Sequence, residues 1–251
     1  MDISWSKNQG LSESRNNGLK YSTSKYIFFL DSDDTLPNNA LEVLYNKAII
    51  TNSDIVIGKM INYNSTCQYD YYTAKWIKNI NNIYYPKDKY ILNFISACGK
   101  LYKKDILKNT KFIPNLKHED NYFSLSLILN RSKISLITDT VYNRRIREGE
   151  NKSITQNLNI NSLNDLLANY EKVLKENNID HYFKKHLILK SIKYIVKYIP
   201  KEEINDSRKL INNFIKLNII KKSKNIEKAY LKIYHRILLI ILKVLVILKR
   251  R

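Results

Sequence analysis

The chain has 251 residues, of which 44% are hydrophobic, and it contains only 5 glycines and 4 prolines. This composition allows a sizeable core and excludes a disordered or collagen-like chain. Two cysteines exclude a disulfide scaffold and a typical zinc cluster, and their scarcity suits a reducing cytoplasm. The net charge of +20 directs attention to anionic partners.

Three carboxylates follow the first strongly apolar segment. Residues 1–25 are expected to form a loop and a helix, and residues 26–30 a buried strand that ends at Asp31, Asp33 and Asp34. Ligands of open α/β sheets bind at the carboxyl ends of strands, and residues two apart on an extended chain leave the same face. Such carboxylates suit Mg²⁺ or Mn²⁺, which bind one or two protein carboxylates together with substrate phosphates. The alternative is a solvated turn in which Asp34 or Thr35 caps the next helix.

The rest of the first 155 residues alternates between helical and extended patterns. We predict helices and strands at 37–51 (helix), 54–60 (strand), 94–103 (strand), 119–130 (helix) and 134–145 (strand). Glu119 and Asp120 begin the second of these helices, where the positive end of the helix stabilises charged carboxylates. A simple N-terminal helix charge is the alternative reading of this pair.

Beyond residue 155 the pattern becomes helical and strongly basic. Residues 181–251 contain 19 Lys and Arg against 4 Asp and Glu, which accounts for +15 of the net charge. A last helix at about 226–251 has a twelve-residue apolar span, about 18 Å long and too short to cross about 30 Å of hydrocarbon. Arg236, Lys243 and Arg250 are seven residues apart and form a basic stripe on it. This pattern predicts a helix lying on an anionic membrane, and a core helix is the alternative.

The order of motifs resembles one known family. Residues 10–18 (GLSESRNNG) and 24–34 (SKYIFFLDSDD) resemble the middle of a family 2 glycosyltransferase domain of GT-A fold. Three later segments resemble the family's K-L-[FY], E-D-x-x-F and Y-x-R…S-I-T motifs: 99–102, 117–123, and 141–145 with 153–155. The resemblance therefore implies an α/β domain with a mixed, Rossmann-like sheet at 1–155, followed by an all-α region at 156–251.

The resemblance also implies roles for individual residues. The metal ligands would be Asp31, Asp33 and Asp34. The donor would be bound by Arg15, Asp31, Asp33, Lys100 and Arg145. Asp120 would be the catalytic base that takes the acceptor proton, with Glu119 in support. The metal, Mn²⁺ or Mg²⁺, would neutralise the leaving diphosphate. A solvated basic loop remains the alternative for Arg145 and its neighbours Arg144 and Arg147.

The resemblance gives an activity and a set of partners. We expect an inverting glycosyltransferase that moves a sugar from a nucleoside-diphosphate sugar to a saccharide or lipid-linked acceptor in bacterial cell-surface polysaccharide synthesis. The enzyme would be cytoplasmic and peripheral on the inner face of the membrane. Tyr71, Tyr72 and Trp76 would lie on the acceptor side and stack on sugars, or would simply be half-buried aromatics.

Two other functions come into consideration, one because the chain departs from the family pattern at its start and one because the chain is strongly basic. The family opens with a P-x-Y-N turn and a D-D-G-S-x-D strand that hold the uracil and ribose, and residues 1–7 match neither. We therefore expect the front of the domain to be missing, so that a truncated, non-catalytic protein that binds membrane or a partner glycosyltransferase is the alternative function. We expect no nucleic-acid binding, because the basic region is interleaved with aliphatic residues and has no known module.

Overall fold

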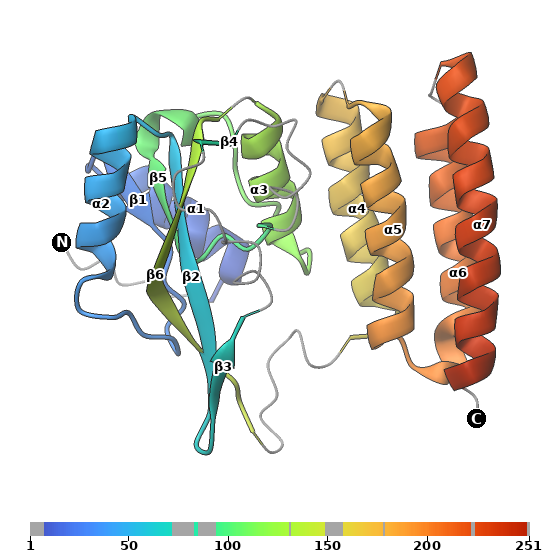
Figure 1. Cartoon of the computed structure of the whole chain (residues 1–251), viewed down its shortest axis with the longest axis horizontal. Helices are drawn as coiled ribbons and strands as arrows, with labels where there is room; N and C mark the ends of the chain where they lie inside the picture. Colours follow the sequence, from blue (N-terminus) through green and yellow to red (C-terminus); the bar gives the residue numbers. More distant parts are fainter. Residues whose placement is uncertain are drawn as a thin grey trace. The chain divides into compact units, whose positions relative to one another are not determined.

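The computed structural model describes residues 8–71, 83–84, 94–130, 132–148, 158–177, 179–221 and 224–249 (Figure 1). The chain divides into two compact units, Met1–Ser153 and Ile154–Arg251.

The first unit alternates helices and strands along the chain. Its elements are α1 (Leu11–Tyr21), β1 (Tyr26–Phe28), α2 (Ala40–Thr51), β2 (Ile55–Tyr63), β3 (Gln68–Asp70), β4 (Ile83–Tyr84), β5 (Lys100–Lys103), a 3₁₀-helix (Lys104–Leu107), α3 (Glu119–Leu129) and β6 (Ile134–Arg145).

The strands form one mixed sheet, as the sequence predicted. The strand order is β1-β5-β2-β6-β4, and β3 pairs with the end of β2. Only the pairing of β2 with β6 is parallel among the described strands, running from Ile55 opposite Ile134 to Tyr63 opposite Arg145. Figure 1 shows α2 on one face of this sheet and α3 on the other. The described part of the first unit is therefore a sheet covered by helices on both faces.

The long parallel pair is buried because its residues are apolar and closely packed. Six of the nine residues of β2 are buried hydrophobics or a buried glycine before the strand reaches the surface at Tyr63. A Cβ on Gly58 would lie 2.4 Å from a methyl group of Val141, so the two strands can approach closely only with glycine at this position. The parallel pair thus fixes where the C-terminal end of β6 lies.

Three predicted elements are shorter in the structure. The strand predicted at 26–30 ends at Phe28, and its three residues are half-buried rather than buried. The strand predicted at 94–103 covers only β5, because residues 94–99 bend and Gly99 has a positive φ of 71°. The hydroxyl of Tyr102 donates to the carbonyl of Ala97 and holds this bend against the strand. The helix predicted at 37–51 begins at Ala40, because residues before it form a turn that closes on Pro37.

The second unit consists of helices with well-defined starts. Its elements are α4 (Ile160–Glu176), α5 (His181–Tyr198), a 3₁₀-helix (Lys201–Glu203), α6 (Ile204–Phe214), a π-helix (Ile215–Ile220) and α7 (Asn225–Lys249). Asn159 and Ser162 form a capping box at the start of α4, and Asp180 caps α5. The all-helical prediction for this region is confirmed. No helix in the described part of the chain is long and apolar enough to cross a membrane.

Candidate functional site

A tight turn, rather than an extended chain, carries the three aspartates after β1. The amide of Asp34 donates to the carbonyl of Asp31 at 3.1 Å and closes the turn. The expectation that Asp31 and Asp33 leave one face of an extended chain is therefore wrong, because the turn directs each carboxylate to a different partner. Asp31 faces Arg15, Asp33 faces Arg147, and Asp34 faces β6.

Arg15 is the centre of the site. From α1 its guanidinium binds Asp31 Oδ1 at 2.8 Å, Glu119 Oε1 at 2.6 Å and Asp120 Oδ1 at 2.9 Å. The guanidinium carbon also lies 5.2 Å from the ring centre of Phe112. Burial disfavours its charge, but the carboxylates outweigh that effect and raise the pKa of Arg15 above its ordinary value. One buried cation thus joins the turn after β1 to the start of α3.

The acidic pair at the start of α3 is held in two different ways. Asp120 accepts from Arg15 through Oδ1 and from the amide of Ala97 through Oδ2 at 3.1 Å. The Glu119 side chain is only 12% exposed, and burial, followed by the charge of Asp120, raises its pKa to about 7. Two carboxylates with different environments therefore share one arginine.

Lys100 lies in the wall of the same site. It is 3% exposed, and its ammonium donates to the carbonyl of Ser96. Burial lowers the pKa of Lys100 to about 8, although the charge of Asp120 acts in the opposite direction. Lys100 is thus positioned to support the bend at residues 94–99 rather than to point outward.

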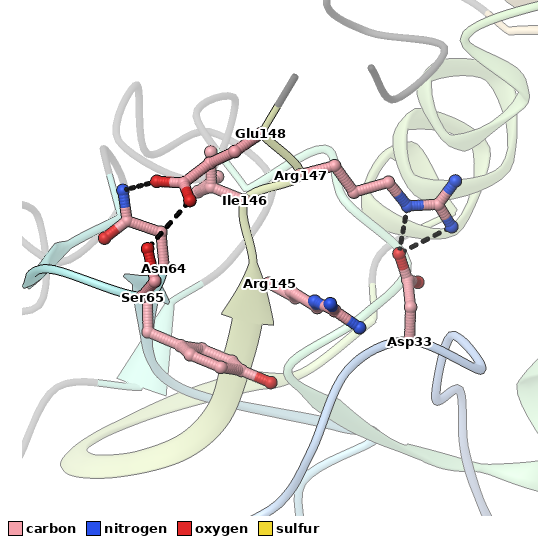
Figure 2. A pocket seen from close by; sticks show the side chains of 8 residues that line it. Asp33, Asn64, Ser65, Arg145, Ile146, Arg147 and Glu148 are labelled. Carbon is pink, nitrogen blue, oxygen red and sulfur yellow. Dashed lines mark hydrogen bonds and ion pairs between the residues drawn. The ribbon is translucent and has the colours of Figure 1, made fainter. Parts of the chain in front are cut away.

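A hollow of about 730 Å³ opens beside the turn, next to the end of β6 (Figure 2). On one side Arg147 binds Asp33 Oδ2 through Nε at 2.8 Å and through Nη2 at 2.7 Å. Figure 2 shows the side chain of Arg145 pointing toward that same side. On the other side Glu148 accepts from Asn64 and Ser65, at 2.7 and 2.8 Å. The hollow therefore presents two guanidinium groups beside an acidic turn.

Sequence reasoning missed the residue that anchors the turn. Tyr142 donates to Asp34 Oδ2 at 2.6 Å and accepts from the amide of Asp31 at 3.1 Å. The amide of Arg145 donates to Asp34 Oδ1 at 2.7 Å. Burial raises the pKa of Asp34, although the hydrogen bonds that it accepts from Tyr142 and from the amide of Arg145 act against the rise. Tyr142 lies within the segment 141–145 that carried a motif, but only the fold brings its hydroxyl to the turn.

The described residues offer at most a partial ligand set for a divalent cation, because Asp31 and Asp33 are directed to different arginines. Among the described residues, no group of three or more His, Cys, Asp or Glu side chains is arranged to hold a metal ion. The carboxylates of Asp31 and Asp33 keep 36% and 28% exposure, and hard oxygens suit Mg²⁺ or Mn²⁺. One or two carboxylates completed by substrate phosphates is the usual arrangement for Mg²⁺.

One predicted aromatic contact can be placed. Tyr71 is half-buried against the core, its amide donates to Met60, and Arg144 lies over its ring at 5.7 Å. Tyr72, Trp76 and the segment 153–155 lie outside the described residues.

Comparison with known proteins agrees with this architecture. Residues 2–110 match the family model for glycosyl transferase family 2. The chain is 30% identical over 194 residues to a cholesterol galactosyltransferase from Borreliella burgdorferi, covering 69% of this chain and 51% of that protein. It is 32% identical over 149 residues to the poly(ribitol-phosphate) beta-N-acetylglucosaminyltransferase TarP from Staphylococcus aureus, covering 54% and 42%.

The fold also matches a solved structure. S. aureus TarS, residues 1–349, in complex with UDP-GlcNAc superposes with a TM-score of 0.64 at 18% identity, over 85% of this chain and 63% of that one. The chain spans 27% to 51% of the length of the first curated relatives that it matches. The N-terminal part of this chain is therefore similar to glycosyltransferase family 2, whose model matches residues 2–110, and it has a GT-A-like mixed α/β sheet.

Proposed function

We propose that the first unit carries the diphosphate-binding and proton-accepting part of an inverting glycosyltransferase. The donor would be a nucleoside-diphosphate sugar, and the acceptor a hydroxyl of a saccharide or of a lipid-linked saccharide in bacterial cell-surface polysaccharide synthesis. The observation that carries this proposal is the buried guanidinium of Arg15, which binds Asp31 beside the proposed donor site and Glu119 and Asp120 at the proposed base. Sugar transfer needs the donor-binding carboxylate and the base that takes the acceptor proton close to each other.

The acidic pair would handle the acceptor proton, and the arginines would bind the leaving diphosphate. The acceptor oxygen attacks the anomeric carbon and loses its proton to Asp120, while the bond from that carbon to the diphosphate oxygen breaks and the diphosphate leaves with the electron pair. Glu119, whose pKa is raised to about 7, can hold the proton afterwards. Arg145 and Arg147 lie where guanidinium groups can bind the departing diphosphate.

A divalent cation fits beside these arginines. Asp31 and Asp33 would hold Mn²⁺ or Mg²⁺, which neutralises charge on the leaving diphosphate when it is bound. The names of the relatives support a sugar transfer, and TarS binds UDP-GlcNAc, so a UDP-sugar is the donor class that we propose.

Calorimetric titration with UDP and Mn²⁺ tests this function. We expect metal-dependent binding to the wild-type chain and its loss in Asp33→Ala. Asp105→Ala is the matched control, because Asp105 is an exposed carboxylate paired with Lys108 in the same unit. If the folded wild-type chain binds neither UDP nor its metal complex, the donor site is refuted, and a non-catalytic association role becomes the better account.

We further propose that α7 lies on an anionic membrane surface. Its described part exposes apolar side chains three to four residues apart: Tyr230 (44%), Ile233 (60%), Ile237 (50%) and Ile240 (61%). The exposed basic residues Lys232 and Arg236 lie on the same helix. An amphipathic helix of this kind binds anionic lipid through apolar burial and charge together.

Vesicle sedimentation tests the membrane proposal. We expect binding to vesicles that contain phosphatidylglycerol, weaker binding to pure phosphatidylcholine, and a loss of binding in Ile237→Asp. The control is Ile50→Asp, which introduces the same charge at a position 82% exposed on α2. Equal binding by both variants would refute a role for α7.

A further inference from the structure

One buried hydroxyl helps to fasten the turn after β1 to β6, next to the backbone bridge between Thr35 and Asn143. Tyr142 Oη accepts from the amide of Asp31, where the turn begins, and donates to the carboxylate of Asp34, where it ends. The other carboxylate oxygen of Asp34 accepts from the amide of Arg145, also on β6. Three hydrogen bonds between 2.6 and 3.1 Å therefore connect a four-residue turn to one strand.

The hydroxyl is held rigidly by its surroundings. Tyr142 has 0% exposure, and its ring stacks on Phe28 of β1 with centres 6.2 Å apart and planes 30° apart. Its backbone pairs with Met60 on β2. A fully buried ring that stacks on Phe28, on a strand whose backbone pairs with β2, has little room to move, so its oxygen is a fixed point for the turn.

The hydrogen bonds divide the roles of the three aspartates. Both carboxylate oxygens of Asp34 bind groups of β6, and Asp33, rather than Asp34, lines the hollow. Asp33, in the middle of the turn, faces that hollow together with Arg147. The bonds at the ends of the turn thus place the backbone of Asp33, whose carboxylate is held by Arg147.

We propose that Tyr142 is a positioning residue for the diphosphate site, and that Asp34 is its anchor on the turn rather than a metal ligand. Through Asp34 and the Asp31 amide, Tyr142 holds Asp33 toward the hollow. This inference rests on the proposed function for its effect on ligand binding, whereas its structural part stands on the hydrogen bonds alone.

Hydrogen exchange tests the structural part. In Tyr142→Phe the amide of Asp31 loses its acceptor and the carboxylate of Asp34 loses a donor. We expect faster exchange in peptides that cover residues 29–36 and no change in peptides from the second unit. Tyr170→Phe is the control, because Tyr170 is 1% exposed in α4 of the other unit and removes an equally buried hydroxyl. Unchanged exchange at 29–36 in Tyr142→Phe would overturn the proposal, whether or not the chain binds a donor.

Ligand titration tests the functional part. We expect Tyr142→Phe to weaken metal-dependent UDP binding by about tenfold, the effect of losing one hydrogen bond to a charged group. Tyr170→Phe should bind as the wild type does. Wild-type affinity in Tyr142→Phe would overturn the positioning role. Absence of UDP binding to the wild type would refute the proposed function, and hydrogen exchange at residues 29–36 would then be the test of the hydrogen bonds between Tyr142 and the turn.

A double-mutant cycle tests whether Tyr142 acts through Asp34. Asp34→Ala should also weaken UDP binding. The double variant, Tyr142→Phe with Asp34→Ala, should bind UDP no more weakly than the weaker-binding single variant, because both changes remove the hydrogen bond between Tyr142 and Asp34. Thermal unfolding monitors whether each variant stays folded. Fully additive losses would show that Asp34 acts separately from Tyr142 and would overturn its assignment as an anchor.

Discussion

Replacing Arg15 by Met is the most informative single change, because it removes one cation from three carboxylates. Methionine retains most of the apolar stem that packs on Phe112, so the variant mainly removes charge and hydrogen bonds. Asp31, Glu119 and Asp120 would then face one another without compensation.

The expected loss follows from burial. The Arg15 side chain is 8% exposed, and those of Glu119 and Asp120 are 12% and 23% exposed. Removing one partner of a buried ion pair costs about 3–5 kcal/mol. Asp31, at 36% exposure, is screened by solvent and adds little. We therefore expect the first unit to lose about 3–4 kcal/mol of its free energy of unfolding at pH 8.

The loss should depend on pH in a definite direction. The pKa of Glu119 is raised in the folded wild type, and it rises further without Arg15. Protonation of Glu119 then relieves repulsion in the variant, so the difference in stability should be smaller at pH 5.5 than at pH 8. The wild type and Arg15→Met share the same pKa of Glu119 in the unfolded state, so the difference arises in the folded state.

Urea unfolding followed by tryptophan fluorescence provides the assay. Both tryptophans, Trp5 and Trp76, fall within the sequence range of the first unit, so a transition in their emission is assigned to that range. Lys108→Met is the control, since its ion pair with Asp105 is exposed and should contribute less than about 1 kcal/mol. A loss below about 1 kcal/mol in Arg15→Met, or one equal at both pH values, would refute the reasoning.

Three further results are expected. Because the folded pKa of Glu119 is about 7 and its ordinary value is 4.5, its protonation stabilises the fold fully below pH 4.5 and ceases to do so as the pH rises through 7. Glu119→Gln should remove that decline, which is at most about 1.4 kcal/mol per pH unit in urea titrations at several pH values. Arg147→Gln should free Asp33 and tighten binding of Mn²⁺ alone by up to about fivefold in calorimetry, with weaker UDP binding; weaker Mn²⁺ binding would contradict competition between the two cations. Gly99→Ala should cost about 1–3 kcal/mol in thermal unfolding, because its φ is 71° and a Cβ would lie 2.7 Å from Met60; an unchanged midpoint would show that the bend adapts.

Local patterns predicted most elements, because periodicity and flanking residues determine them. The helix α3 and the strand β6 begin and end within a residue of their predicted bounds, since long buried elements leave clear patterns. The turn after β1 was predicted as extended, because its geometry depends on Tyr142, which lies 111 residues from Asp31. The roles proposed for individual site residues remain predictions.

The meeting of Arg15 with the acidic pair could not be read from the sequence. The partners lie 104 and 105 residues apart, and no local signal indicates that α1 and α3 approach the same point. The resemblance to a family named the participating residues, whereas only the fold shows that one guanidinium binds all three carboxylates.

The separate caps and interiors of the two units have a consequence for how such chains can evolve. The first unit has its own core cluster, from Phe29 to Tyr142, and the helices of the second begin with their own caps at Asn159 and Asp180. A gene for such a chain could exchange its helical segment by recombination near the boundary between the two units and keep the core cluster of the first. Selection on the proposed membrane-binding helix could then proceed independently of selection on the proposed sugar transfer.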